Sequence, residues 1–185
     1  MEHLTWEQLK RLLATAKEHS ERNWLLLLVI FWHGLRVSEV VGNKSHAGLT
    51  PRNLRDGHLR IQRLKGSLKT DQPLISHKNP LLDEKAALLA WAAGHAQDQK
   101  LFDISRQNVD LIMKDYCADA GIRSALAHVH VLKHSLAMAM LGEGVPLPML
   151  QKRLGHKSLA STGQYLRVSD DDASAAVQKA LAKKA

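Results

Sequence analysis

The sequence is poor in cysteine and in aromatic residues. Cys117 is the only cysteine among 185 residues, which excludes an intrachain disulfide and a zinc site built from several cysteines. Aromatic residues make up only 4% of the chain, so the core has to be built mainly from Leu, Ala, Val and Ile. Such a composition favours helices.

The chain also lacks a long hydrophobic run. The strongly apolar stretch at residues 24–32 is far shorter than the roughly 20 residues that a membrane-spanning helix requires. It lies inside the chain and does not have the layout of a signal peptide. We therefore interpret it as a buried helix of a soluble, intracellular protein that contacts no membrane.

Negative charge is scarce relative to positive charge. The chain has 26 Lys and Arg residues against 18 Asp and Glu residues, which gives a formal net charge of +8. A basic surface attracts phosphate backbones and accelerates encounters with them. Charge alone fits a nucleic-acid-binding protein and a merely soluble basic protein equally well, so the motifs have to decide between them.

Helical periodicity dominates the chain and predicts a single domain over residues 1–185, mainly α with a small antiparallel β-sheet (α+β). Thr5 is the expected N-cap of the first helix, and Gly34 marks the end of the second. A short helix is expected after Val37. Apart from this short helix, the predicted helices span roughly residues 5–19, 21–33, 83–93, 105–120, 129–141, 148–154, 158–165 and 170–183.

The segment 47–77 has a different pattern. Pro and Gly residues interrupt it, and apolar and polar residues alternate at positions 59–64. This alternation predicts short antiparallel strands inserted into the helical domain. Asp56-Gly57 predicts a tight hairpin turn, and a second turn is expected at 65–67.

Two early segments carry residues suited to breaking a DNA strand. That reaction needs a nucleophile at phosphorus, fixed cations around the transition state and an acid for the departing 5′ oxygen. Arg36 follows a helix end, where its guanidinium can fork onto a phosphate, and Glu39 can hold it there. Lys65 lies at a predicted hairpin tip and can act as the acid. Taken singly, Arg36 also fits a helix-end arginine that is paired to an acid. Lys65 alone also fits a solvated turn lysine, which is the usual case.

A third segment places basic residues on one helical face. His130, Lys133 and His134 have the i, i+3, i+4 spacing that brings side chains together. Two histidines four residues apart can also bind a metal ion. However, no Glu follows His130, as the zinc-protease motif would require, and no metal site is predicted.

A fourth segment contains a tyrosine. Gly155 ends a helix and leaves His156 at the start of a turn, and Ser158 can cap the next helix. Tyr165 is expected near the C-terminal end of that helix. Taken alone, it would be an ordinary half-buried tyrosine.

Together, the four segments resemble the catalytic domain of the tyrosine recombinase (phage integrase) family. Their order and approximate spacing match, and Leu-Gly-His with a tyrosine nine positions after the histidine is a specific signature, as is the earlier His-x-x-basic-His. Residues 4–9 also look like the start of that domain. The resemblance implies a site-specific recombinase that cleaves and rejoins DNA through a 3′-phosphotyrosyl intermediate, without a cofactor or metal.

The resemblance implies a role for each of these residues. The set consists of Arg36 as phosphate clamp, Glu39 as its support, Lys65 as the acid for the leaving 5′ oxygen, His130 and His156 as phosphate ligands, and Tyr165 as the nucleophile. Lys69 and Arg63 are expected to contact DNA. The implied partners are duplex DNA, further copies of the chain in a dimer or tetramer on that DNA, and accessory DNA-bending proteins.

One departure from the family pattern concerns activity. Lys133 stands where the family box has its second arginine, and it keeps the charge but loses the planar two-pronged fork. One alternative to an active recombinase is therefore a DNA-binding relative on the same fold that is catalytically weakened or inactive. A type IB topoisomerase, which resembles the family in fold and chemistry, is a further alternative.

The other departure concerns domain organisation. The sequence has no room for a separate N-terminal core-binding domain, as expected of an excised catalytic domain or of a short recombinase resembling the fimbrial inversion recombinases. The predicted last helix, 170–183, carries an apolar stripe. That stripe is expected to pack either on its own domain or on a neighbouring protomer.

Overall fold

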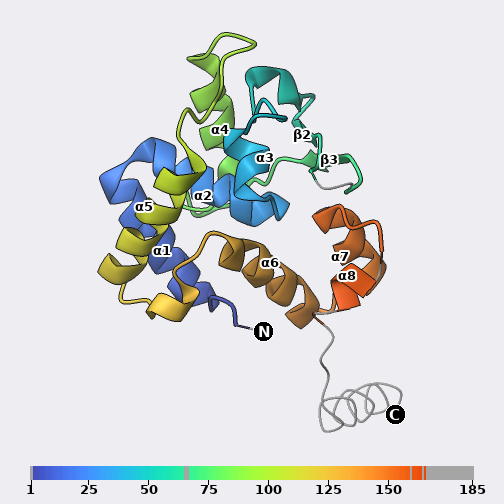
Figure 1. Cartoon of the computed structure of the whole chain (residues 1–185). Coiled ribbons are helices and arrows are strands. Elements are labelled where there is room, and N and C mark those ends of the chain that lie inside the picture. The colour runs from blue at the N-terminus through green and yellow to red at the C-terminus, as the bar shows by residue number, and fades with distance from the viewer. Residues whose placement is uncertain (1, 65–66, 159, 164, 166–185) are drawn as a thin grey trace, which may run out of the picture.

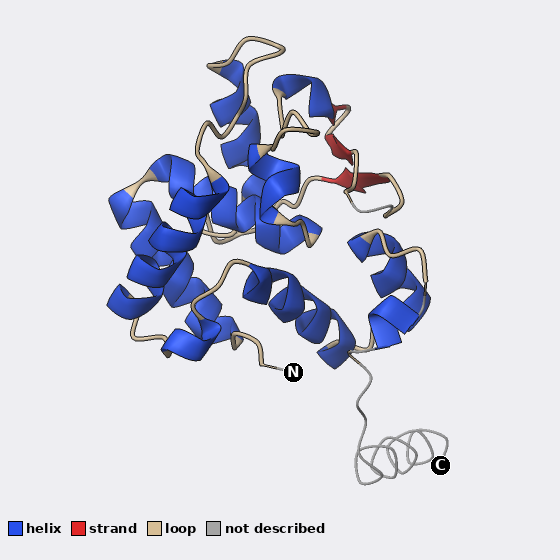
Figure 2. Ribbon diagram, in the orientation of Figure 1, coloured by secondary structure: helices blue, strands red, loops and turns tan. Residues whose placement is uncertain are grey.

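The computed structural model describes residues 2–64, 67–158, 160–163 and 165. The predicted α+β fold is confirmed, because helices form most of the described chain and a three-stranded sheet lies at one corner (Figures 1 and 2). The helices are α1 (Trp6–His19), α2 (Glu21–His33), α3 (Val37–Val41), α4 (Glu84–Ala93), α5 (Arg106–Asp119), α6 (His130–Gly142), α7 (Leu147–Leu154) and α8 (Ala160–Gly163). Short 3₁₀ turns cover Pro51–Asn53 and Ser124–Leu126.

Local sequence signals set the first two helices. Thr5 Oγ1 caps α1 by accepting a hydrogen bond from the Gln8 amide, and Gln8 Oε1 accepts one from the Thr5 amide, which completes a capping box. Ser20 caps α2, and Gly34 ends it in the left-handed conformation with φ 57°. These boundaries confirm the predicted first and second helices.

Helix α2 forms the centre of the core. Every residue from Trp24 to Phe31 is at most 1% exposed, because α1, α4 and α6 pack around it. The predicted burial of the 24–32 stretch is therefore confirmed, apart from the partly exposed Trp32. Among the described helices, none has the length and hydropathy to cross a membrane.

The sheet forms where the alternating pattern predicted it. Strands β1 (Leu54–Arg55), β2 (His58–Ile61) and β3 (Thr70–Pro73) pair antiparallel in the order β1-β2-β3, with Leu59 opposite both Leu54 and Gln72. Asp56 and Gly57 both have positive φ, of 53° and 73°, as a tight Asp-Gly hairpin turn requires.

Helices α6, α7 and α8, the last that the structure describes, pack one against the next. Helix α6 packs on α2 and on α7, and α7 contacts both β3 and α8, so α7 and α8 lie beside the sheet (Figure 1). Ser158 caps α8 through a hydrogen bond to the Ala160 amide, as predicted. Tyr165 lies in a turn after α8 rather than in the helix. The predicted helix 170–183 lies outside the described residues.

Candidate active site

Arg36 is held at the junction of α2 and α3. The chain can turn there because Gly34 is left-handed and lacks a side chain: a Cβ at Gly34 would lie only 2.5 Å from the Leu154 Cδ2. The Arg36 side chain is 27% exposed and its Nη1 donates to Glu39 Oε1 at 3.2 Å. Its guanidinium is therefore anchored on one side and open to a ligand on the other.

Glu39 is the buried anchor, as the sequence predicted for a supporting acid. Its Oε2 accepts hydrogen bonds from the Arg36 amide at 2.8 Å and from Arg63 Nη1 at 3.1 Å. Its Oε1 also accepts from the Leu64 amide at 2.9 Å. Burial raises the Glu39 pKa, but the Arg63 charge and these amide hydrogen bonds lower it by more, so the net pKa lies below its usual value. Glu39 is therefore an ionised carboxylate that joins the Arg36 segment to the sheet.

The predicted DNA contact by Arg63 is wrong. Its side chain has 0% exposure, and its guanidinium donates to three backbone carbonyls, those of His33 at 2.9 Å, Arg153 at 3.0 Å and Gly34 at 3.2 Å. A buried guanidinium satisfied in this way cannot reach a DNA backbone. Lys69, the other predicted DNA contact, is exposed.

The chain on either side of the predicted hairpin tip is docked against the site. Arg36 Nη1 donates to the Leu64 carbonyl at 3.4 Å and to Ser67 Oγ at 3.3 Å, and the Leu68 amide donates to the Gly155 carbonyl at 2.9 Å. Lys65 itself lies outside the described residues.

Helix α6 contributes two residues with different exposures. His130 is exposed, and loss of hydration together with the charges of His134, Lys133 and Arg36 lowers its pKa to about 4. Lys133 is only 2% exposed, and its Nζ donates to the Leu154 carbonyl at 3.3 Å. Burial, followed by the charges of Arg63 and Arg36, lowers the Lys133 pKa to about 7.

His156 and Tyr165 complete the predicted set. His156 is 7% exposed, and its Nδ1 shares a hydrogen bond of 3.0 Å with Thr162 Oγ1. Burial, with the charges of Lys133, Arg36 and Arg63, lowers its pKa to about 4. Tyr165 is also 7% exposed, and burial raises its pKa to about 12 against the opposing effect of Arg36.

The charge of Arg36 links the predicted residues to one another. The Arg36 charge acts on the pKa of each of the other predicted residues that the structure describes, namely His130, Lys133, His156 and Tyr165. A cavity of about 570 Å³ opens beside Arg36 and His130, and Arg106 and His128 also line it. Basic side chains therefore dominate the wall of this cavity, which also contains Asp110. Among the described residues, no group of three or more His, Cys, Asp or Glu is placed to hold a metal ion.

The sequence predictions assigned no role to two features of the site. His134, noted only for its position on the helix face, has its Nδ1 3.1 Å from the Tyr165 hydroxyl, and its i+4 spacing from His130 was the available signal. Below the site, His33 contacts Gln72 at 2.7 Å and Glu84 at 2.6 Å, all three buried. No local pattern could reveal this second cluster, because its members come from α2, β3 and α4.

Comparisons with known proteins agree with this geometry. The model of the phage integrase family matches residues 2–172. The tyrosine recombinase XerA of Pyrococcus furiosus is 29% identical over 181 residues, which cover 96% of this chain and 61% of that protein. The fimbriae regulatory protein FimB of Escherichia coli is 29% identical, over 88% of this chain and 82% of its own length. The chain thus spans less than two thirds of the length of XerA.

A solved structure shares the fold. The XerH site-specific recombinase, bound to its difH substrate before cleavage, superposes with a TM-score of 0.70 at 20% identity, over 95% of this chain and 53% of that one. Because the family model matches nearly the whole chain, this chain belongs to the phage integrase family.

Proposed function

We propose that this chain is a site-specific DNA recombinase that cleaves and rejoins strands through Tyr165. The observation that carries this proposal is geometric: Arg36 and His130 line one cavity, and the His130 ring contacts His134, whose Nδ1 lies 3.1 Å from the Tyr165 hydroxyl. Fixed positive charge beside a nucleophile is what a phosphodiester needs, because its transition state gathers negative charge on the non-bridging oxygens.

In the proposed reaction, Arg36 clamps the scissile phosphate with Glu39 fixing its orientation. His130 lies at the cavity wall, where it can contact a phosphate oxygen, and His156 is a second ligand supported by Thr162. The Tyr165 oxygen attacks phosphorus, and Lys65 gives a proton to the departing 5′ oxygen. A 5′ hydroxyl from another strand then attacks the phosphotyrosyl bond and releases the tyrosine.

Duplex DNA is the proposed partner, and Lys69 is a proposed contact to its backbone. Among this chain's relatives, XerH is seen bound to difH. Each chain has one candidate nucleophile, so exchange between two strands requires at least two protomers on the DNA. Accessory proteins that bend the DNA, and action in the cytoplasm, belong to the same proposal.

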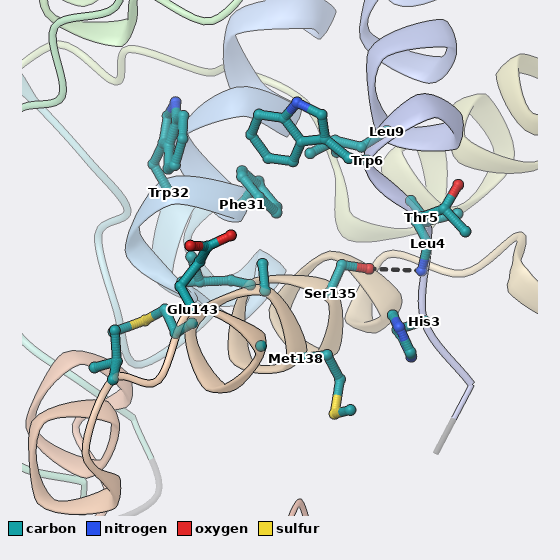
Figure 3. Close-up of a pocket in the computed structure, with 15 residues that line it drawn as sticks. His3, Leu4, Thr5, Trp6, Leu9, Phe31, Trp32, Ser135, Met138 and Glu143 are labelled. Atoms are coloured by element: carbon teal, nitrogen blue, oxygen red, sulfur yellow. Dashed lines mark hydrogen bonds between the residues drawn. The ribbon is translucent and has the colours of Figure 1, made fainter. Parts of the chain in front are cut away.

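An apolar groove supports a contact between protomers. It has a volume of about 610 Å³ and is lined by Trp6 of α1, Phe31 and Trp32 of α2, and Met138 of α6 (Figure 3). The segment 170–183 carries small apolar residues at helical spacing, and we assign this groove to that segment of a second copy. Ending the chain after residue 168 should then leave single protomers on DNA where the full chain forms dimers or larger species by light scattering. A lowered melting temperature with unchanged assembly would instead place the segment on its own domain.

Covalent capture tests the proposed activity. The full chain is incubated with a pool of nicked duplexes of randomised sequence, and adducts that survive denaturation are sequenced. Tyr165→Phe should abolish the adduct. Tyr116→Phe, which alters the only other tyrosine of the chain, should retain it. DNA binding without any adduct would favour the non-cutting relative, and an adduct that persists in Tyr165→Phe would assign another nucleophile.

A further inference from the structure

The Tyr165 hydroxyl has a specific partner on α6. His134 Nδ1 lies 3.1 Å from the Tyr165 oxygen, and the two rings meet edge to face with centroids 5.7 Å apart. On its other side, the His134 ring meets the His130 ring at a centroid distance of 4.5 Å and an angle of 86°. The imidazole is therefore fixed between the phosphate-facing histidine and the nucleophile.

Proton transfer from Tyr165 to His134 requires a protonated phenol and an uncharged imidazole. Loss of hydration, and then the positive charges of His128, Lys133 and the chain's amino group, lower the His134 pKa. His134 is therefore uncharged at neutral pH. The Tyr165 pKa of about 12 keeps the phenol protonated. With both groups in these states, the Nε2–H tautomer of His134 accepts the phenol hydrogen bond at Nδ1, and the proposed role requires this tautomer.

We propose that His134 takes the proton of Tyr165 as the tyrosine attacks DNA, a role that rests on the proposed recombinase function. The bond from the Tyr165 oxygen to phosphorus forms, the bond from phosphorus to the 5′ oxygen breaks, and the phenol proton moves to His134 Nδ1. The leaving 5′ oxygen receives its proton from Lys65. In the rejoining step a 5′ hydroxyl attacks, and the imidazolium returns its proton to the departing tyrosine, as microscopic reversibility requires.

The other two histidines of the site are less suited to this role. His156 Nδ1 is engaged with the Thr162 hydroxyl, and His130 lines the cavity beside Arg36. Within the described part of the chain, the side-chain hydrogen bond recorded for Tyr165 goes to His134. The new imidazolium would face His128, His130 and Lys133, and the incoming phosphate supplies the negative charge that offsets them.

A change of leaving group distinguishes a residue that acts as the base for Tyr165 from one that acts as the acid for the leaving 5′ oxygen. A duplex in which sulfur replaces the bridging 5′ oxygen releases a thiolate, which departs without a proton because thiols are much stronger acids than alcohols. On sequences recovered from the randomised pool, His134→Ala should slow adduct formation by about 10²-fold or more with either leaving group. The matched control Lys65→Ala should be slow with oxygen and fast with sulfur. Rescue of His134→Ala by sulfur, or an unchanged rate, would overturn the proposal.

His134→Gln separates proton transfer from positioning. Glutamine can still accept the phenol hydrogen bond but cannot carry a proton away. We expect this variant to be as slow as His134→Ala, and to lose the fall in rate that the unaltered chain shows as His134 becomes protonated at low pH. A rate restored by glutamine would reduce His134 to a positioning residue and overturn the base role.

The contact itself can be tested without DNA. The chain has two tyrosines, so ¹³Cζ-labelled tyrosine gives two NMR signals that Tyr116→Phe assigns. His134→Ala should move the Tyr165 signal and leave that of Tyr116 in place, whereas the control His128→Ala should leave the hydrogen bond intact. An unmoved Tyr165 signal overturns the proposal even if adducts form. Absence of adducts with the unaltered chain, on every duplex of the pool, overturns the recombinase function and the catalytic role of His134 with it.

Discussion

Glu39 and Arg63 form an ion pair of 3.1 Å in which both side chains are completely buried. Glu39 also holds Arg36, and Arg63 binds carbonyl groups at the ends of α2 and α7. The pair therefore joins Arg36 to the helices that carry the rest of the proposed site. Its burial explains why a basic residue close to the catalytic centre has a structural role.

Removal of one member of this pair should cost much of the stability of the protein. In Arg63→Ala, the Glu39 carboxylate and three carbonyls lose a donor inside the core, and we expect unfolding to require roughly 3–5 kcal/mol less free energy. Urea denaturation measures the change. The control is Lys69→Ala, whose exposed side chain should leave the unfolding free energy within about 0.5 kcal/mol while weakening DNA binding. Equal stability of the two variants would contradict the structural role of Arg63.

The sequence contained a signal for the burial of Arg63. Leu59, Ile61 and Arg63 alternate along one strand direction, so all three share the inward face, and two of them are apolar. Lys133 is comparable, since it shares an α6 face with the buried Leu136 and Ala137. The positive charge of Arg63 and the motif around Lys133 led to expected roles at DNA, although the apolar periodicity around both positions indicates burial.

Caps and turns were predictable because their determinants are local. The N-cap Thr5, the terminator Gly34 and the Asp56-Gly57 turn each act over a few residues. The contact between His134 and Tyr165 joins residues 31 positions apart and depends on how α6, α7 and α8 pack. Spacing along one helix could indicate which face His134 occupies, but not that a tyrosine would meet it there.

The buried charge of Lys133 should give the DNA-free protein a characteristic pH dependence. The folded-state pKa of Lys133 is about 7, below the ordinary value of 10.5. Between these two values the unfolded chain binds more protons than the folded one, so the folded state gains stability as pH rises through this window. Below pH 7 both states are protonated and the penalty for burying the charge is complete.

Lys133→Met should remove this dependence. Methionine keeps the length of the side chain without its charge, so the variant should be more stable than the unaltered chain at pH 6 and close to it at pH 10. Chemical denaturation at the two pH values gives the comparison. A constant difference between the two proteins over this range would show that Lys133 keeps its proton in the folded state.

Lys133→Arg should accelerate catalysis. A guanidinium fork presents more than one N–H group to the phosphate, and one added hydrogen bond to a charged group corresponds to about a tenfold faster adduct formation. Single-turnover rates on a duplex recovered from the randomised pool test this. If the longer side chain disturbs the Leu154 carbonyl that Lys133 binds, the melting temperature will fall together with the rate. A lower rate in a variant that keeps its melting temperature would contradict the expectation.

Gly155, at the end of α7, allows the backbone around Leu68 to pack closely against it. Its φ is +69°, and a Cβ there would lie 3.0 Å from the Leu68 carbonyl oxygen and 3.2 Å from the Arg63 side chain. Gly155→Ala should therefore lower the unfolding free energy by roughly 1–3 kcal/mol, because the strained backbone and the close contacts act together. It should also displace His156, the next residue, and slow adduct formation. Gly142→Ala is the matched control, since Gly142 ends α6 with open space around it and alanine is expected to be neutral or stabilising there by about 0.5 kcal/mol. Gly155→Ala should lower both the melting temperature and the adduct rate, whereas Gly142→Ala should lower neither. A Gly155→Ala protein with unchanged stability and rate would show that the segment around Leu68 can move aside freely.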